Sequence, residues 1–304
     1  MKIATTTEEF NRFHKTYIDK VKELYSLGFK YIDISFYDQY KNGSEIMSEN
    51  WRDTVAKLKE FSQATGVKYV QSHLPGHNPL NESENTDYEH MSNIRTIEIC
   101  GELGIKNAVF HCGFKKDIGK KEFFELNKEY IQLLTPYLEK HNVNLCIENS
   151  CKSNLGKYYY FFDGKEMREF IEYINHPNIT ACWDTGHANI EGHQYEDIIA
   201  LGEKLTALHI NDNRGEKDEH ILPYTGTMNI DEVMTALTEI NFKGYFTFES
   251  GNAIIFTNSW PYKRPIFEKN QKSNTPDIIC KRIFVQAQLE IGKKILTDYN
   301  CYED

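Results

Sequence analysis

The sequence predicts a single (β/α)8 barrel, an α/β fold in which eight parallel strands alternate with helices. Two observations lead to this class. Eight short runs rich in β-branched and aromatic residues recur along the 304-residue chain, and amphipathic stretches lie between them. No proline- or serine-rich linker interrupts the alternation. Eight such units in a chain of this length favour one barrel domain over residues 1–304 rather than two domains.

The expected strands and helices follow one another in a regular order. The expected strands are residues 2–4, 31–34, 67–70, 108–110, 144–147, 179–183, 207–210 and 245–248. Stretches such as 17–27 and 123–138 carry apolar residues three and four apart, which is typical of amphipathic helices. Three expected helices end at a glycine, namely Gly28, Gly66 and Gly104. A doubly wound sheet is the alternative, but no G-x-G-x-x-G turn follows the first strand, and we expect no nucleotide cofactor.

Composition narrows the class of partner. The chain has 35 basic and 45 acidic residues, a net charge of -10, which disfavours nucleic acid because phosphate backbones are held by clustered Lys and Arg. The sequence contains neither a signal-peptide pattern nor an apolar run of membrane-spanning length, so we expect a cytoplasmic protein without a membrane partner. Seven scattered cysteines with no C-x-x-C pair indicate reduced thiols.

Potential metal ligands stand where the later strands end. In a (β/α)8 barrel the active residues lie at the carboxyl ends of the strands. Those ends carry His73, His111, Glu148, Asp184 with His187, His209 and Glu249, and the loop after the seventh strand adds Asp218 and His220. Carboxylates and imidazoles that converge are costly to bury unless a cation binds them. The pattern therefore predicts a divalent metal site for Mn, Zn, Co or Mg.

Each of these residues also has a structural interpretation. A lone histidine at a strand end is more often hydrogen-bonded than metal-bound, and Asp218 alone would be a solvated loop charge. The joint pattern favours the metal site, because five of the eleven histidines fall on one rim of the expected barrel.

Three segments resemble the xylose isomerase-like barrels, a family that includes sugar phosphate isomerases and epimerases, ketose 3-epimerases and endonuclease IV. They are C-I-E-N at 146–149, W-D-T-G-H-A-N at 183–189 and H-I-N-D-N-R-G-E-K-D-E-H at 209–220. The P-Y-T-G-T-M-N that follows is close to the family's P-G-x-G-x-I, but Tyr224 and Thr225 separate its proline from its glycine.

The resemblance implies an isomerase or epimerase acting on a small-molecule sugar or sugar phosphate. One divalent metal would be held by Glu148, Asp184, His209 and Glu249. Glu148 and Glu249 would act as the acid/base pair that moves a proton next to a carbonyl. His187, with His73 and His111, would contact the substrate.

Two other functions remain open at this point. Endonuclease IV holds three zinc ions with residues that match all nine positions, so His73, His111, His187, Asp218 and His220 are possible additional metal ligands. Against a phosphodiesterase acting on abasic DNA, His111 precedes Cys-Gly where the nuclease has Pro-Gly, Gly186 stands where it has cysteine, and the charge is acidic. The third possibility is a barrel that binds a metal and a polyol without catalysis.

The stretch after the eighth strand, residues 251–277, is long for a βα loop, and such loops are often functional. Trp260, Lys263 and Arg264 are candidates for a lid that binds the substrate, with Lys263 or Arg264 on a phosphate. An oligomer contact or a solvated loop is the alternative, and a homo-oligomer is possible. Aromatic residues after the first two strands (Phe10, Phe13, Phe36 and Tyr37) would either line the pocket or pack against neighbours.

Overall fold

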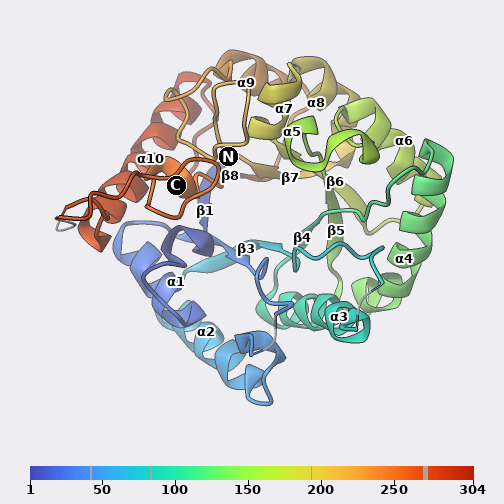
Figure 1. Ribbon diagram of the computed structural model, residues 1–304, viewed down its shortest axis with the longest axis horizontal. Coiled ribbons are helices and arrows are strands. Elements are labelled where there is room, and N and C mark those ends of the chain that lie inside the picture. The colour runs from blue at the N-terminus through green and yellow to red at the C-terminus, as the bar shows by residue number, and fades with distance from the viewer. Residues whose placement is uncertain (42, 83, 193, 270–272) are drawn as a thin grey trace.

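The computed structural model describes residues 1–41, 43–82, 84–192, 194–269 and 273–304. Eight parallel strands curl into a barrel with the helices around it (Figure 1), so the predicted fold class is confirmed. The strands are β1 (Lys2–Thr6), β2 (Tyr31–Ser35), β3 (Lys68–His73), β4 (Asn107–Phe110), β5 (Asn144–Glu148), β6 (Ile179–Asp184), β7 (Leu205–His209) and β8 (Tyr245–Phe248).

Helices follow the strands, and most of them cover the outside of the barrel (Figure 1). They are α1 (Tyr17–Ser26), α2 (Trp51–Thr65), α3 (Thr86–Leu103), α4 (Lys120–His141), α5 (Lys152–Leu155), α6 (Gly164–Ile174), α7 (Thr185–Glu191), α8 (Tyr195–Leu201), α9 (Ile230–Glu239) and α10 (Ile278–Asp298). The 3-10 turns are η1 (Thr7–Phe10), η2 (Glu45–Met47), η3 (Gly156–Tyr158), η4 (Gly202–Lys204) and η5 (Gly251–Ala253). None of the helices in the described ranges is long and apolar enough to cross a membrane.

The strands are ordered β7-β6-β5-β4-β3-β2-β1-β8, so that β1 pairs with both β2 and β8. Two backbone hydrogen bonds connect the ends of this order. Ile210 N donates to Thr247 O at 2.8 Å, and Glu249 N donates to Ile210 O at 3.0 Å. The barrel is therefore nearly closed, and the carboxyl ends of all eight strands meet on one rim.

The expected strands agree with the structure to within a few residues, because runs covered on both faces read as continuously apolar. All six residues of β6 are buried. The glycine signals also agree, since Gly66 and Gly104 end α2 and α3 with positive φ angles of 78° and 75°. All seven cysteines are free thiols.

One irregularity lies between β2 and β3, beside a buried carboxylate inside the barrel. The register between β2 and β3 shifts between Ile32 and Asp33. Ile32 pairs with Tyr69 and Asp33 pairs with Gln71, so Val70 is the extra residue and the bulge belongs to β3. Asp33 is buried, and its Oδ2 accepts a hydrogen bond of 3.0 Å from Nε2 of Gln71.

Candidate metal centre

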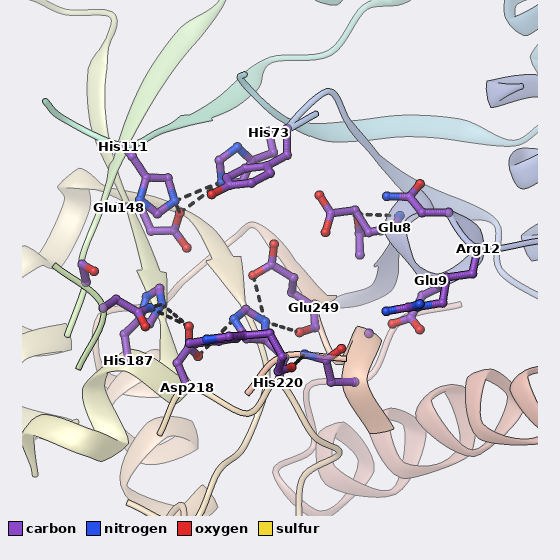
Figure 2. A pocket seen from close by; sticks show the side chains of 18 of the residues that line it. Glu8, Glu9, Arg12, His73, His111, Glu148, His187, Asp218, His220 and Glu249 are labelled. Carbon is purple, nitrogen blue, oxygen red and sulfur yellow. Dashed lines mark hydrogen bonds and ion pairs between the residues drawn. The ribbon is translucent and has the colours of Figure 1, made fainter. Parts of the chain in front are cut away.

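A cavity of about 730 Å³ lies at the carboxyl ends of the strands. Seven of the nine predicted ligand residues line it, and Figure 2 labels all seven: His73, His111, Glu148, His187, Asp218, His220 and Glu249. Asp184 and His209 are almost completely buried beside them. The structure therefore brings all nine residues together, in three groups of potential ligands.

The first group consists of Glu148, Asp184, His209 and Glu249, and one ligand atom from each lies within 4.8 Å of the others. His209 Nδ1 lies 2.6 Å from Glu148 Oε1 and 3.3 Å from Glu249 Oε2. These four residues end strands β5, β6, β7 and β8 or follow them directly. Three carboxylates and one imidazole nitrogen form a donor set that suits a divalent cation.

A second group shares Glu148 with the first. Glu148 Oε2 lies 2.7 Å from His111 Nε2 and 3.4 Å from His73 Nε2. The two imidazole rings are stacked, with centroids 5.0 Å apart. Two ring nitrogens therefore face one carboxylate oxygen.

The third group consists of His187, Asp218 and His220. Asp218 Oδ2 lies 3.1 Å from His187 Nε2, and Asp218 Oδ1 lies 3.0 Å from His220 Nε2. Asn154 Nδ2 donates to Asp218 Oδ2 at 2.7 Å. The loop between β7 and α9, which carries Asp218 and His220, is thereby connected to α7 and α5.

Backbone carbonyls orient three of the histidines. His73 Nδ1 lies 2.6 Å from Leu74 O, and His187 Nδ1 lies 3.0 Å from Asn149 O. His220 Nδ1 lies 2.9 Å from Glu249 O. A carbonyl oxygen only accepts, so Nδ1 carries a proton, and Nε2 is the nitrogen that faces the cavity and can bind a cation once it has lost its own proton. This arrangement is the usual one around metal-binding histidines.

The carboxylates determine the protonation of these rings. Burial lowers the pKa of His187, but the charges of Asp184 and Asp218 outweigh it and raise the pKa well above its usual value. The pKa of His220 is raised in the same way by Asp218. The pKa of His209 is raised by Glu249 and Glu148. Protons and a divalent cation compete for the same lone pairs. The carboxylates that attract protons to these histidines would therefore also attract a divalent cation.

The two glutamates differ in pKa. Burial opposes ionisation of Glu148, but His209 and His111 outweigh it and hold its pKa well below the usual range. Burial raises the pKa of Glu249 to about 7, although His209 and His220 partly offset this effect. Two carboxyl groups with separated pKa values are typical of acid/base pairs.

Unpaired oxygens test whether a cation fits. Glu148 Oε2 and Asp218 Oδ1 are buried without a hydrogen-bond donor, although each lies close to a histidine nitrogen. A buried carboxylate oxygen without a donor is costly. A divalent cation between oxygen and nitrogen would satisfy both, so the residues present fit a metal.

Local structure explains the spacing of Asp184 and His187. Asp184 is the N-cap of α7, and its Oδ1 accepts from His187 N at 2.7 Å. Asn211 Nδ2 donates to the other oxygen at 2.7 Å. A Cβ atom at Gly186 would lie 1.8 Å from Asn211 Oδ1, so only glycine leaves room for Asn211 to hold Asp184.

Sequence reasoning missed several residues that support the site. Asp33 Oδ2 lies 3.7 Å from Nε2 of His209, on the side of the ring opposite Glu148. Asn154 and Asn211 hold Asp218 and Asp184. Asn211 lies within the H-I-N-D segment, two residues after His209, and that position in the sequence could have indicated a role at the site. No such signal marks Asp33, which is a single charge in an apolar strand.

The loop after β8 contributes differently from expectation. Trp260 lines the cavity, but Lys263 and Arg264 do not belong to its lining. Arg264 Nε instead donates to Ile255 O at 2.6 Å, within its own loop. Of the four aromatic residues considered after the first two strands, Phe13 and Tyr37 line the cavity, whereas Phe10 and Phe36 are buried in the core. Part of the predicted loop, residues 270–272, lies outside the described residues.

Curated proteins with similar sequences include two informative matches. The uncharacterized protein y4fM of Sinorhizobium fredii is 26% identical over 219 residues, 68% of this chain and 67% of that protein. The L-ribulose 3-epimerase of Methylomonas sp. is 29% identical over 161 residues, 50% of this chain and 49% of that protein. The matched stretches thus span about half to two thirds of these relatives.

Solved structures share the fold over almost the whole chain. A D-tagatose 3-epimerase-like protein superimposes with a TM-score of 0.75 and 20% identity, covering 99% of this chain and 98% of that one. The IolI protein with a bound zinc atom has a TM-score of 0.72 and 16% identity, with complete coverage of both chains.

The family comparison covers most of the chain. The family model described as the xylose isomerase-like TIM barrel matches residues 21–265. This range contains strands β2 to β8 and every one of the nine residues of the three ligand groups. The chain belongs to the xylose isomerase-like TIM barrel family.

Proposed function

We propose that the protein is a divalent-metal-dependent sugar isomerase or epimerase that moves a proton on a carbon next to a carbonyl. Glu148 and Glu249 form its acid/base pair. The metal ligands are Glu148, Asp184, His209 and Glu249, and Mn, Zn, Co and Mg are the candidate metals.

One observation carries this proposal. Glu148 and Glu249, from the ends of strands separated by β6 and β7, both approach His209 Nδ1, at 2.6 Å and 3.3 Å. Both carboxylates line the cavity. Two bases on a common centre suit the removal of a proton and its return on the other face or at the neighbouring carbon.

The residues divide the chemistry as follows. A bound divalent cation would polarise the carbonyl and neighbouring hydroxyl of the sugar and so acidify the adjacent C–H bond. One glutamate removes that proton and the other returns one. His187, whose Nδ1 is held by Asn149 O, directs Nε2 toward the cavity and donates to or accepts from a substrate oxygen.

The relatives support sugar chemistry more than phosphodiester cleavage. Among the curated relatives, three carry names of sugar 3-epimerases, acting on L-ribulose, on a ketose and on D-psicose. The three ligand groups are also compatible with a trinuclear phosphodiesterase. The cavity disfavours a duplex. Among the described residues that line it, two are lysine or arginine (Arg12 and Lys281) and five are acidic (Glu8, Glu9, Glu148, Asp218 and Glu249).

Deuterium incorporation tests the proposal. The metal-loaded protein is incubated in deuterated water with a panel of ketoses, and exchange next to the carbonyl is followed by NMR. We expect exchange with at least one ketose, and a loss of about a thousandfold or more in Glu148→Gln and Glu249→Gln. Glu232→Gln, on the exposed face of α9, is the matched control and keeps full activity. Scission of an abasic-site duplex at catalytic concentration, without exchange on any ketose, would overturn the proposal.

A further inference from the structure

We propose that the cavity contains a second subsite beside the metal centre, which binds a neutral sugar ring attached to the reacting ketose. This subsite deepens the proposed function and depends on it. The substrate class becomes a ketose that bears a glycosyl group, rather than a free ketose or a ketose phosphate.

The size of the cavity is the first reason. Pockets that enclose whole drug-sized ligands measure about 300–1,000 Å³, and this cavity measures about 730 Å³. The metal-ligand groups line only one part of it. In Figure 2, Glu8, Glu9 and Arg12 lie apart from His73, His111 and Glu148, with Glu249 between the two sets. A single sugar ring on the metal centre would leave the other part filled with solvent.

An exposed tryptophan is the second reason. Trp260 lines the cavity with 55% of its surface exposed, which is unusual for so large an apolar side chain. Its carbonyl accepts a 2.9 Å hydrogen bond from Nδ2 of Asn252, another lining residue. An indole offers a wide apolar face and an N–H donor. Those properties match a sugar ring, which has an apolar C–H face and a rim of hydroxyls.

An arginine held in place is the third reason. The guanidinium of Arg12 lies 4.6 Å from the ring centroid of Phe256, and its Nη1 donates to Asn258 Oδ1. Phe13 packs on the same ring, with centroids 6.0 Å apart. Arg12, Phe13 and Phe256 all line the cavity. The stacked guanidinium keeps further N–H donors for a ligand, at a low entropy cost because it is already oriented.

Charge favours a neutral ligand over a phosphate. The other lining cation, Lys281, is neutralised by Glu9 and donates to Gly251 O at 3.0 Å. Glu8 also lines this part, and its carboxylate accepts from Ser35 Oγ. A phosphate beside Arg12 would therefore share this part of the cavity with the carboxylate of Glu8, whereas hydroxyl groups can donate to a carboxylate and accept from a guanidinium.

The test compares three probes on the metal-loaded protein: the disaccharide isomaltulose, which is a glucosyl-fructose, with fructose and fructose 6-phosphate. Deuterium exchange next to the carbonyl gives kcat/KM for each. We expect isomaltulose to exceed fructose by about tenfold or more, as contacts in one subsite allow. Trp260→Ala and Arg12→Ala should each lower that ratio by about tenfold. Tyr173→Ala, which removes a comparably exposed aromatic ring on α6, is the control and leaves the ratio unchanged.

A binding experiment separates failure of this subsite from failure of the proposed function. Saturation-transfer NMR reports contact between the glucosyl protons of isomaltulose and the protein without turnover. Contact that is lost in Trp260→Ala supports the subsite even if no ketose is converted. Three outcomes would each overturn the subsite. They are a higher kcat/KM for fructose than for isomaltulose, a ratio of the two values that is unaltered in both variants, and a preference for fructose 6-phosphate that depends on Arg12.

Discussion

Glu148 Oε1 and His209 Nδ1 lie 2.6 Å apart at the base of the cavity, although 61 residues separate them in the chain. His209 turns its other nitrogen toward Asp33, at 3.7 Å. The ring is thus held between a carboxylate inside the barrel and one that faces the cavity. This orientation directs Nδ1 to the group that contains three carboxylates.

Metal content is the first prediction. Affinity for a cation increases with the number of charged ligands, so we expect the group of Glu148, Asp184, His209 and Glu249 to retain about one divalent cation per chain after purification without added metal or chelator. Elemental analysis measures it. Asp184→Asn should lose this cation, and Asp218→Asn should keep it. Close to three zinc ions per chain, with loss in Asp218→Asn, would contradict this expectation and place phosphodiester cleavage first.

Asp33 provides the second prediction. It contacts His209 rather than the cavity, so its role is to orient that ring. Loss of such an outer partner typically weakens metal binding about 10- to 100-fold. We expect this loss in Asp33→Ala, measured by competition with a chelating dye, while the metal-free protein remains folded by circular dichroism. Asp53→Asn, an exposed change on α2, is the control. Unchanged metal affinity in Asp33→Ala would show that His209 needs no such support.

The buried ion pair of Lys281 and Glu9 provides the third prediction. Both side chains are buried, and Gln288 Nε2 donates to the second oxygen of Glu9 at 2.6 Å. Removing one partner of a buried pair costs about 3–5 kcal/mol, because the other charge stays buried. We expect a loss of this size for Lys281→Met in chemical denaturation, and a smaller loss for the double variant Lys281→Met with Glu9→Gln.

An exposed pair is the control for that experiment. Lys294 and Asp298 form an ion pair on the solvent side of α10, with side chains 70% and 48% exposed. Exposed pairs contribute about 0–1 kcal/mol, so Lys294→Met should change the stability little. Equal losses in the two single variants would mean that Lys281 is not held as a buried charge.

His77 provides the fourth prediction, on pH. Burial lowers its pKa to about 4, against about 6.5 in an unfolded chain. The unfolded state therefore binds the proton more readily than the folded state. The contribution of neutral His77 to the free energy of unfolding is complete above about pH 6.5 and is lost as the pH falls toward 4. Between pH 7 and pH 5 the metal-free protein should lose about 2 kcal/mol through this residue. His77→Asn should lose less over that interval, as measured by denaturation at both pH values. A parallel decrease in both proteins would contradict the assignment.

Much of the site could be predicted from sequence alone, because strand ends are local features. Short apolar runs ending in His73, His111 or Glu148 place those residues on one rim once the strands form a barrel. The structure assembles them as expected, and their metal binding stays a prediction. The lid expected after β8 stays a prediction, and of its three named residues Trp260 lines the cavity. Lys263 and Arg264 do not line the cavity, and Arg12, from the turn after β1, lines it instead.

The sequence by itself determined the fold class and the set of residues at the carboxyl rim, since both depend on periodicity and on the order of short elements. Only the tertiary structure decided which groups support that rim. Asp33 of β2 meets His209 of β7 inside the barrel, and Lys281 meets Glu9 across 272 residues of chain. These contacts depend on barrel closure and on the docking of α10 against η1, which no local pattern encodes.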